Sequence, residues 1–319
     1  MSKSRLWDIL QLSAAGLLRG VLVLWTAVTL VFVAVRVLPG DAISAELLPA
    51  GASDAQIEAE KNKQGLNDSL PQQYLHYMGD LLHGNLGYSL RYRDAVSHIV
   101  KDRIGPTFAL AMAAFAVMLI TGTILGVTST TASPAPLRHF SRGIIALSQS
   151  VPIYITAIVA VFIFSLELDL LPSIGSDTPS HLILPAAVLG FHTSGAVTRV
   201  LSASLTDAFQ QPFMLTARAK GLPPIDLLDH GLRVALLPVL RVLALQTGFL
   251  LGGTVIIEGL FVRRGLGSLL FESVLNRDYP MVQALALLAA ICYLVANGLA
   301  RLTQRLIDPR LTNNLADFA

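Results

Sequence analysis

Charged residues are scarce in this chain of 319 residues, since lysine, arginine, aspartate and glutamate make up only 14% of it. A soluble domain carries about 25% charged residues. Hydrophobic residues make up 53%, and the mean hydropathy is +0.62. This composition argues against a soluble or disordered protein and indicates one that crosses a membrane several times. The formal net charge of +2 is too small to suggest nucleic acid as a partner.

Cysteine is nearly absent, and so are the common motifs of catalysis and nucleotide binding. The single cysteine, Cys292, lies in an apolar run, which excludes an intramolecular disulfide and indicates a small buried side chain. None of the lysines falls in the phosphate-binding pattern G-x-x-x-x-G-K-[ST], and neither H-E-x-x-H nor G-x-S-x-G occurs. The chain is therefore predicted not to be an enzyme and to bind no cofactor itself.

The histidines do not form a metal site by their spacing. There are seven of them, and none pairs with cysteine or carboxylates at metal-ligand spacing. The run His192-Thr193-Ser194 suggests an intramembrane enzyme, a protease, as an alternative hypothesis. A base and a nucleophile two residues apart on a helix do not face each other, which weakens that hypothesis. No resident metal is predicted.

Six apolar segments are long enough to cross about 30 Å of hydrocarbon, which takes about 20 helical residues. The sequence therefore predicts an all-α membrane protein with six transmembrane helices. No linker or repeat divides it, so residues 1–319 are predicted to form a single transmembrane domain. The predicted spans are Gly16–Val37, Thr107–Thr130, Gly143–Leu166, Leu182–Leu201, Leu240–Ile257 and Met281–Leu299.

Lysine and arginine in the short loops predict that both termini are cytoplasmic. The outer loop Asp169–His181 has neither residue, whereas the outer loop Gly259–Pro280 weakens the pattern with three arginines. The basic residues of the inner segments are Lys3, Arg5, Arg19, Arg138, Arg142, Arg218, Lys220, Arg233, Arg301, Arg305 and Arg310.

The largest polar segment, residues 42–106, is predicted to be extracytoplasmic. Ala55–Lys63 is predicted to be helical, and a second helix is predicted to begin at Leu70. The segment is too small for an enzyme domain with its own core, so it is expected to cap the pore mouth. The apolar residues at helical spacing in the second helix are Tyr74, Leu75, Met78 and Leu82.

Small and polar residues inside the spans indicate either close packing or a pathway. Gly122 and Gly126 form a G-x-x-x-G pair, which suits helix packing. Polar residues at membrane depth face a cavity or the interior of the bundle, so both interpretations stay open for the pore candidates. These candidates are Gln149, Ser150, Tyr154, His192, Gln246 and Gly252.

The segment between the fourth and fifth predicted spans, residues 202–239, is predicted to be a structured cytoplasmic loop. A helix is expected to end at Gly221, because Pro223 and Pro224 follow it, and a second short amphipathic piece is expected after them. A compact polar loop between spans suits docking to a partner protein. The docking part is residues 216–240, with the candidates Thr216, Ala217, Arg218, Ala219, Lys220, Gly221, Leu222, Asp226 and His230.

Several short motifs follow one another along the chain. The segment Thr216–Leu240 contains Ala-Arg-Ala-Lys-Gly-Leu, then His-x-Leu-Arg and Leu-Pro. The others are Leu38-Pro39-Gly40-Asp41, Gly84-x-x-Gly87-x-Ser89, Glu258-x-x-Phe261 with Gly265-Leu266-Gly267, Arg277-Asp278-Tyr279-Pro280 and Asp308-Pro309-Arg310. This ordered set resembles the permeases of ABC importers, in the dipeptide, oligopeptide and nickel branch.

The resemblance implies a type I importer permease with the MetI-like fold in the cytoplasmic (inner) membrane. It implies that the chain forms half of a translocation pore, surrounded by membrane lipid, and couples to an ATPase through the 216–240 loop. The expected partners are a second homologous permease, two cytoplasmic ATPase subunits that use ATP and magnesium, and an external solute-binding protein. A solitary membrane channel is the alternative.

The cargo stays open between dipeptides, oligopeptides, nickel and metal chelates. The short outer loop Asp169–His181 is more similar to nickel-type members. The chain departs from the family at Val234, where asparagine is common, and at Arg264, where proline is common. Leu215 stands at about the place of an acidic residue in the broader family.

Overall fold

The computed structural model describes residues 3–37, 42–49, 51–130, 134–176 and 178–307. The motifs at residues 38–41 and 308–310 therefore lie outside the described residues. The chain forms two compact units. Unit 1 comprises residues 1–105 and 268–294, and unit 2 comprises residues 106–267 and 295–319.

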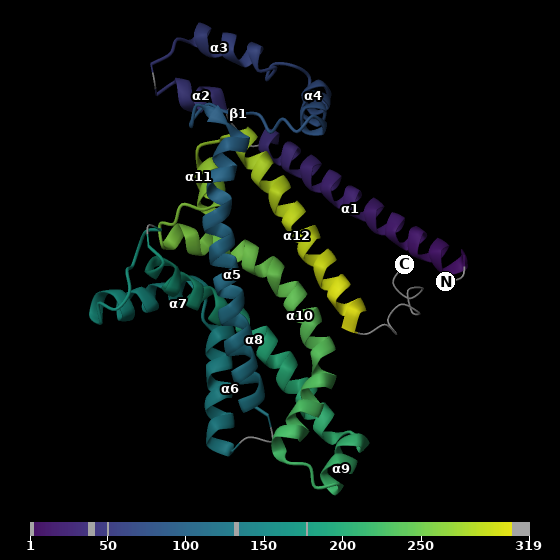
Figure 1. Cartoon of the computed structure of the whole chain (residues 1–319). Coiled ribbons are helices and arrows are strands. Elements are labelled where there is room, and N and C mark those ends of the chain that lie inside the picture. The colour runs from purple at the N-terminus through teal and green to yellow at the C-terminus, as the bar shows by residue number, and fades with distance from the viewer. Residues whose placement is uncertain (1–2, 38–41, 50, 131–133, 177, 308–319) are drawn as a thin grey trace. The chain divides into compact units, whose positions relative to one another are not determined.

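Helices make up most of the described structure (Figure 1). Two short strands pair antiparallel, with Tyr88 opposite Ala95. The elements in chain order are α1 (Lys3–Val37), α2 (Ala42–Leu47), α3 (Asp54–Lys63), α4 (Leu70–Leu82), β1 (Tyr88–Ser89), β2 (Asp94–Ala95), α5 (Val96–Thr128), α6 (Ala135–Ser150), α7 (Ile153–Val161), the π-helix η1 (Phe162–Glu167), α8 (Ser180–Gln210), α9 (Pro212–Ala219), α10 (Pro224–Leu260), α11 (Leu266–Leu275) and α12 (Tyr279–Ile307).

Among the described residues, four helices are long and apolar enough to cross a membrane, or five spans result if one bent pair counts as a single span. The four overlap the first, second, fifth and sixth predicted spans. Their apolar parts are Leu18–Val37 in α1, Val96–Thr128 in α5, Pro224–Leu250 in α10 and Tyr279–Leu299 in α12.

The predicted third span, Gly143–Leu166, is not one continuous helix. α6 ends at Ser150, α7 begins at Ile153, and the helix direction changes by 109° between them. Pro152 explains the break, because it has no N–H for a helical hydrogen bond and disfavours a helical conformation at the residue before it. Val151 is accordingly extended, with φ −92° and ψ 126°. The predicted third span therefore corresponds to a sharply bent pair of helices.

α8 contains the predicted fourth span, but it is not apolar enough to be counted with the four long apolar helices. Its middle is buried inside unit 2, and its buried hydroxyls bond to carbonyls of the same helix. Thr193 Oγ1 donates to the Leu189 carbonyl at 2.9 Å, and Thr198 Oγ1 donates to the Ser194 carbonyl at 2.9 Å. These bonds make the polar residues compatible with a buried helix. The count of six spans stays a prediction.

Glycines allow α5 and α8 to approach closely. A β-carbon built on Gly190 of α8 would lie 2.5 Å from the Ala114 carbonyl oxygen, closer than real β-carbons approach. On α5, a β-carbon on Gly126 would lie 2.7 Å from the side chain of Leu201. Gly122 is also buried against α8. The predicted packing role of the G-x-x-x-G pair is confirmed.

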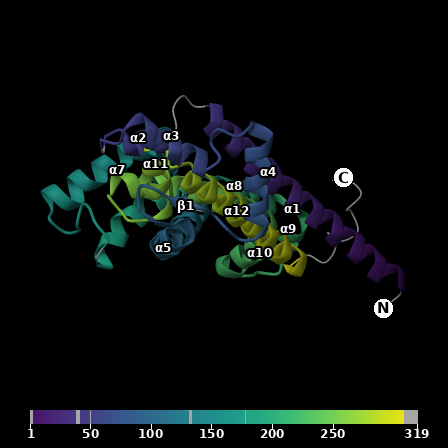
Figure 2. The same cartoon turned by 90° about the horizontal axis from the view of Figure 1, so that it is seen from above.

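In unit 1, α4 lies beside the C-terminal end of α1 (Figures 1 and 2). The Phe32 ring meets the Tyr74 ring edge-on, with centroids 5.3 Å apart, and stacks on the Tyr77 ring at 5.7 Å. Tyr74 also forms a hydroxyl–hydroxyl hydrogen bond of 2.7 Å with Thr29. These contacts attach the segment that was predicted to be extracytoplasmic to the first apolar helix.

The two predicted helices of this segment are confirmed as α3 and α4, but the packed face of α4 was only partly predicted. Leu75 and Leu82 were expected to belong to its apolar face, yet they are 69% and 83% exposed. Phe32 explains the difference, because its ring packs against the rings of Tyr74 and Tyr77 and so determines which face of α4 is covered. A contact with a residue about 40 positions away cannot be seen in the helical spacing.

Two family-like motifs meet in unit 1. Ser89 donates a hydrogen bond to the carboxylate of Asp278, and both residues are buried. Gly87 packs against Pro280, since a β-carbon on Gly87 would lie 3.1 Å from the proline ring. These contacts hold the segment after α4 against the start of α12.

A buried carboxylate organises one end of unit 2. Glu258, on α10, is fully buried. It accepts a hydrogen bond of 2.6 Å from the Thr107 hydroxyl and one of 2.8 Å from the Gly267 amide. Thr107 in turn accepts a bond of 2.7 Å from the Leu266 amide. A β-carbon on Gly265 would lie 2.1 Å from the carboxyl carbon of Glu258, so the Glu and Gly motifs describe one tightly packed structure.

We expect Gly190→Val to destabilise unit 2 by about 1–3 kcal/mol, because the added side chain must push α5 away from α8. Gly143→Val is the matched control, since a β-carbon at Gly143 would meet nothing within 4 Å. Thermal unfolding of the purified protein in detergent measures both. Equal unfolding temperatures for the two variants would contradict the close-packing interpretation.

Candidate functional site

α9 and the turn after it form the most sharply defined part of the predicted docking segment. α9 is eight residues long, and Pro212 occupies its first turn, where a missing N–H costs nothing. At its end, the Gly221 amide bonds to the Arg218 carbonyl at 2.9 Å, and the Leu222 amide bonds to the Ala217 carbonyl at 3.3 Å. This pair of bonds is the Schellman motif.

Gly221 has a φ of +75°, in the left-handed region that favours glycine. A β-carbon there would meet nothing within 4 Å, so the requirement for glycine is conformational. Pro223 and Pro224 follow, and α10 begins at Pro224. The predicted helix end at Gly221 is confirmed.

The two faces of α9 differ. Met214 and Ala217 are buried, at 0% and 6% exposure, and anchor the helix to unit 2. The opposite face is exposed, and Leu215 is 70% exposed there. A short helix held by one face and capped at its end presents its other face in a fixed orientation. The remaining exposed residues of this surface are Phe213, Thr216, Arg218, Ala219 and Lys220.

The second half of the predicted docking segment is the beginning of a long helix. α10 runs without interruption for 37 residues, from Pro224 to Leu260. The expectations of a separate short amphipathic piece and of a span that starts at Leu240 were therefore wrong. Pro224 is tolerated at the first position of the helix, so α10 can begin directly after the turn and continue into the apolar part.

The candidates on α10 are exposed at its first two turns. The Asp226 carbonyl makes a hydrogen bond of 2.7 Å with His230 Nδ1. One turn further, Arg233 and Asp229 form an exposed ion pair of 2.9 Å. Leu201 and Leu205 of α8 pack with Ala235 in one buried cluster, which joins this end of α10 to α8. A displacement of α9 would therefore be transmitted to two long helices.

The pore candidates lie in different surroundings. Gln149 is exposed on α6 and accepts a hydrogen bond of 2.6 Å from Arg199 of α8. Gln246 is buried and donates to the Thr193 carbonyl at 3.1 Å, so it bonds α10 to α8. His192 is partly buried, and its Nδ1 has no hydrogen-bond partner among the described residues. Ser150, Tyr154 and Gly252 are exposed.

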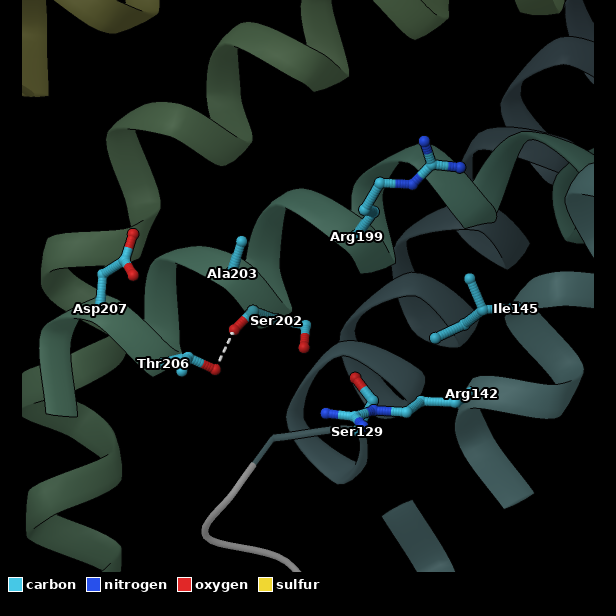
Figure 3. A pocket seen from close by; sticks show the side chains of 8 residues that line it. All are labelled: Ser129, Arg142, Ile145, Arg199, Ser202, Ala203, Thr206 and Asp207. Atoms are coloured by element: carbon cyan, nitrogen blue, oxygen red, sulfur yellow. Dashed lines mark hydrogen bonds between the residues drawn. The ribbon is translucent and has the colours of Figure 1, made fainter. Parts of the chain in front are cut away.

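A polar cleft of about 410 Å³ lies between α6, α8 and the end of α5 (Figure 3). Arg199, Ser202 and Thr206 follow one another along the α8 wall, and Thr206 Oγ1 donates to the Ser202 carbonyl at 2.8 Å. This polar stripe was not predicted, although its spacing of three and four residues is visible in the sequence. The other lining residues are Ser129, Arg142, Ile145, Ala203 and Asp207.

The architecture matches solved ABC transporters. An inward-facing methionine transporter, MetNI, matches with a TM-score of 0.55 and 17% identity, over 66% of this chain and 96% of that chain. An amino acid ABC transporter matches with a TM-score of 0.52 and 15% identity, over 66% and 94%. The fold class is therefore that of an ABC-importer permease, the MetI-type fold that was predicted.

Sequence comparisons identify the family. The model described as "binding-protein-dependent transport system inner membrane component" matches residues 118–313. A protein named as a peptide permease from Brucella suis biovar 1 is 34% identical over 308 residues, 92% of this chain and 97% of that protein. The glutathione transport system permease protein GsiC of Pectobacterium atrosepticum is 37% identical over 284 residues, 88% and 92%.

The chain belongs to this family of inner-membrane transport components. It is a permease subunit of a binding-protein-dependent ABC importer, and it is a multi-pass protein of the inner membrane. Such importers work with ATPase and solute-binding partners.

Proposed function

We propose that the exposed face of α9, with the first turns of α10, docks into a groove of a cytoplasmic ATPase. The observation that carries the proposal is the two-faced α9. Met214 holds it from one side, while Leu215 is exposed on the other. Apolar side chains beside Arg218 and Lys220 suit a protein partner, and the Gly221 turn sets the angle between α9 and α10.

The proposed complex contains two ATPase subunits, which bind ATP and magnesium, and two permeases that each form half of the pore. Closure of the ATPases would displace α9, and the uninterrupted α10 would carry the displacement into the membrane. An external solute-binding protein would deliver the cargo. A solitary channel, by contrast, would conduct without any ATPase, so uptake that stops when the ATPase is inactivated separates the two functions.

We propose a peptide-class cargo, because relatives are named for peptide and glutathione transport. These names favour peptides over nickel for this chain. Uptake of labelled dipeptides and glutathione by the reconstituted complex, with nickel in a parallel assay, tests the choice. Nickel uptake without peptide uptake would overturn it.

Gly221→Val should uncouple ATP hydrolysis from uptake, because a β-branched residue at positive φ costs roughly 1–2 kcal/mol and distorts the turn. Gly221→Asn is the matched control, since asparagine tolerates this conformation. Uptake and ATPase activity are measured on the same reconstituted complexes. A Val variant that assembles and transports normally would refute the docking assignment.

The native complex should contain a second, different permease chain. Reconstitution of this chain with the ATPases and the binding protein alone should give little uptake, because half of the pore is missing. Adding the homologous partner should restore it. Full uptake from this permease alone would show that the pore is formed by two copies of this chain.

His192→Ala should leave uptake nearly unchanged, while His192→Trp should obstruct it. No three His, Cys, Asp or Glu side chains of the described residues are placed to hold a metal ion together, so His192 has no partners for a stable metal site. A pathway that binds its cargo weakly can release it. Loss of uptake in the alanine variant, with rescue by His192→Cys, would contradict this prediction and favour bare-metal transport.

A further inference from the structure

Three buried polar atoms line one cavity of unit 1 and have no hydrogen-bond partner among the described residues. They are Nη1 of Arg36, the hydroxyl of Tyr77 and Nε2 of Gln283. The cavity has a volume of about 180 Å³ and lies between the end of α1, α4 and the first turns of α12. Buried polar groups in folded proteins are nearly always paired, so three unpaired atoms around one space indicate an occupant.

All three groups donate hydrogen bonds. A guanidinium has donors only, and Nε2 of a glutamine is an amide donor. Burial raises the pKa of Tyr77 to about 12, so its hydroxyl keeps its proton at neutral pH and can donate it. The missing partner is therefore a group rich in acceptor oxygens.

Arg36 is held in position to act on this space. Its Nε donates to Gln73 Oε1 at 2.8 Å, and its guanidinium carbon lies 4.8 Å from the Phe32 ring centre and 5.5 Å from that of Tyr279. Gln73 is fixed in turn by two bonds of 2.9 Å to the carbonyls of Leu66 and Asp68. The guanidinium is thus oriented before any ligand arrives.

The charge of Arg36 is not neutralised by an ion pair among the described residues. The other titratable groups of the cavity wall besides the two tyrosines are His76 and Asp80, and both are exposed. Asp80 Oδ1 accepts a hydrogen bond of 3.1 Å from Asn85. A positive charge with directed donors favours an anionic oxygen ligand.

We propose that this cavity binds one carboxylate or phosphate group. Its volume of about 180 Å³ suits such a group with a few adjoining atoms. The group can come from a small soluble anion or from a lipid headgroup, because Arg36 lies in the last turn of the apolar stretch Leu18–Val37, where an interface is expected. The proposal concerns a single chain and does not depend on the proposed ATPase docking.

The test is thermal unfolding of the purified full chain in detergent, titrated with three anionic probes. These are acetate, inorganic phosphate and dihexanoyl phosphatidylglycerol, with chloride and dihexanoyl phosphatidylcholine as controls. Saturable stabilisation by acetate or phosphate assigns the site to small anions. Stabilisation by phosphatidylglycerol alone assigns it to a lipid headgroup. No saturable effect of any anionic probe overturns the proposal.

Variants connect the binding to the cavity. Arg36→Gln and Gln283→Leu should weaken it by about tenfold or more, since each removes a charge or a donor. Arg19→Gln is the matched control, because Arg19 is exposed on the same helix about midway along it, well away from the cavity. Unchanged affinity in Arg36→Gln and Gln283→Leu would overturn the assignment of the site.

Tyr77→Phe distinguishes a loss of ligand binding from a general loss of protein stability. It removes an unpaired buried donor, so without ligand the variant should unfold at the same temperature as the parent protein or higher. With the anionic probe, its stabilisation should be smaller than that of the parent. A lower unfolding temperature without ligand, with undiminished stabilisation by the probe, would show that the hydroxyl is satisfied within the protein and would contradict the proposal.

Discussion

The close approach of neighbouring helices to α8 is the constraint on which the rest of unit 2 depends. α8 carries polar side chains that would be costly in lipid, and burial among other helices removes them from it. Glycine makes this burial possible, because Gly190 leaves room for the backbone of α5 and Gly195 leaves room for Ser148 and Gln149 of α6. The buried hydroxyls of Thr193, Ser194 and Thr198 then bond to carbonyls of α8 itself, so these polar groups are paired where the helix is buried.

The same packing explains how a surface helix of eight residues could act on the membrane part. α8 ends at Gln210, and α9 begins two residues later at Pro212. The Gly221 turn leads directly into α10, whose first half packs on α8 through Ala235. α9 is thus joined at both ends to long helices that contact each other. A rigid connection of this kind transmits displacement better than a flexible loop, which would absorb it.

Local chemistry could be predicted from the sequence, whereas long-range contacts could not. The end of α9 followed from glycine and proline alone, and the packing of Gly122 and Gly126 followed from their spacing. The 109° bend at Pro152 was not predicted, because the apolar residues continue on both sides of the proline. The packed face of α4 was only partly predicted, because it is determined by ring contacts with Phe32, which lies on another helix. The polar stripe at Arg199 could have been detected from its periodicity, but its place beside α6 depends on packing between helices.

Several residues of the family-like motifs lie at points of close contact within the protein. Their residue types are therefore explained by the architecture and not by selectivity for a cargo. Gly265 and Gly267 leave space for the carboxylate of Glu258, and within unit 1 Gly87 leaves space for Pro280. None of these residues needs a cargo to explain its type, because a larger side chain would collide with the protein itself. Matching them to relatives therefore establishes the scaffold. The residues that distinguish one cargo from another must be ones whose side chains are not buried in packing contacts, or they must belong to the solute-binding protein that presents the cargo.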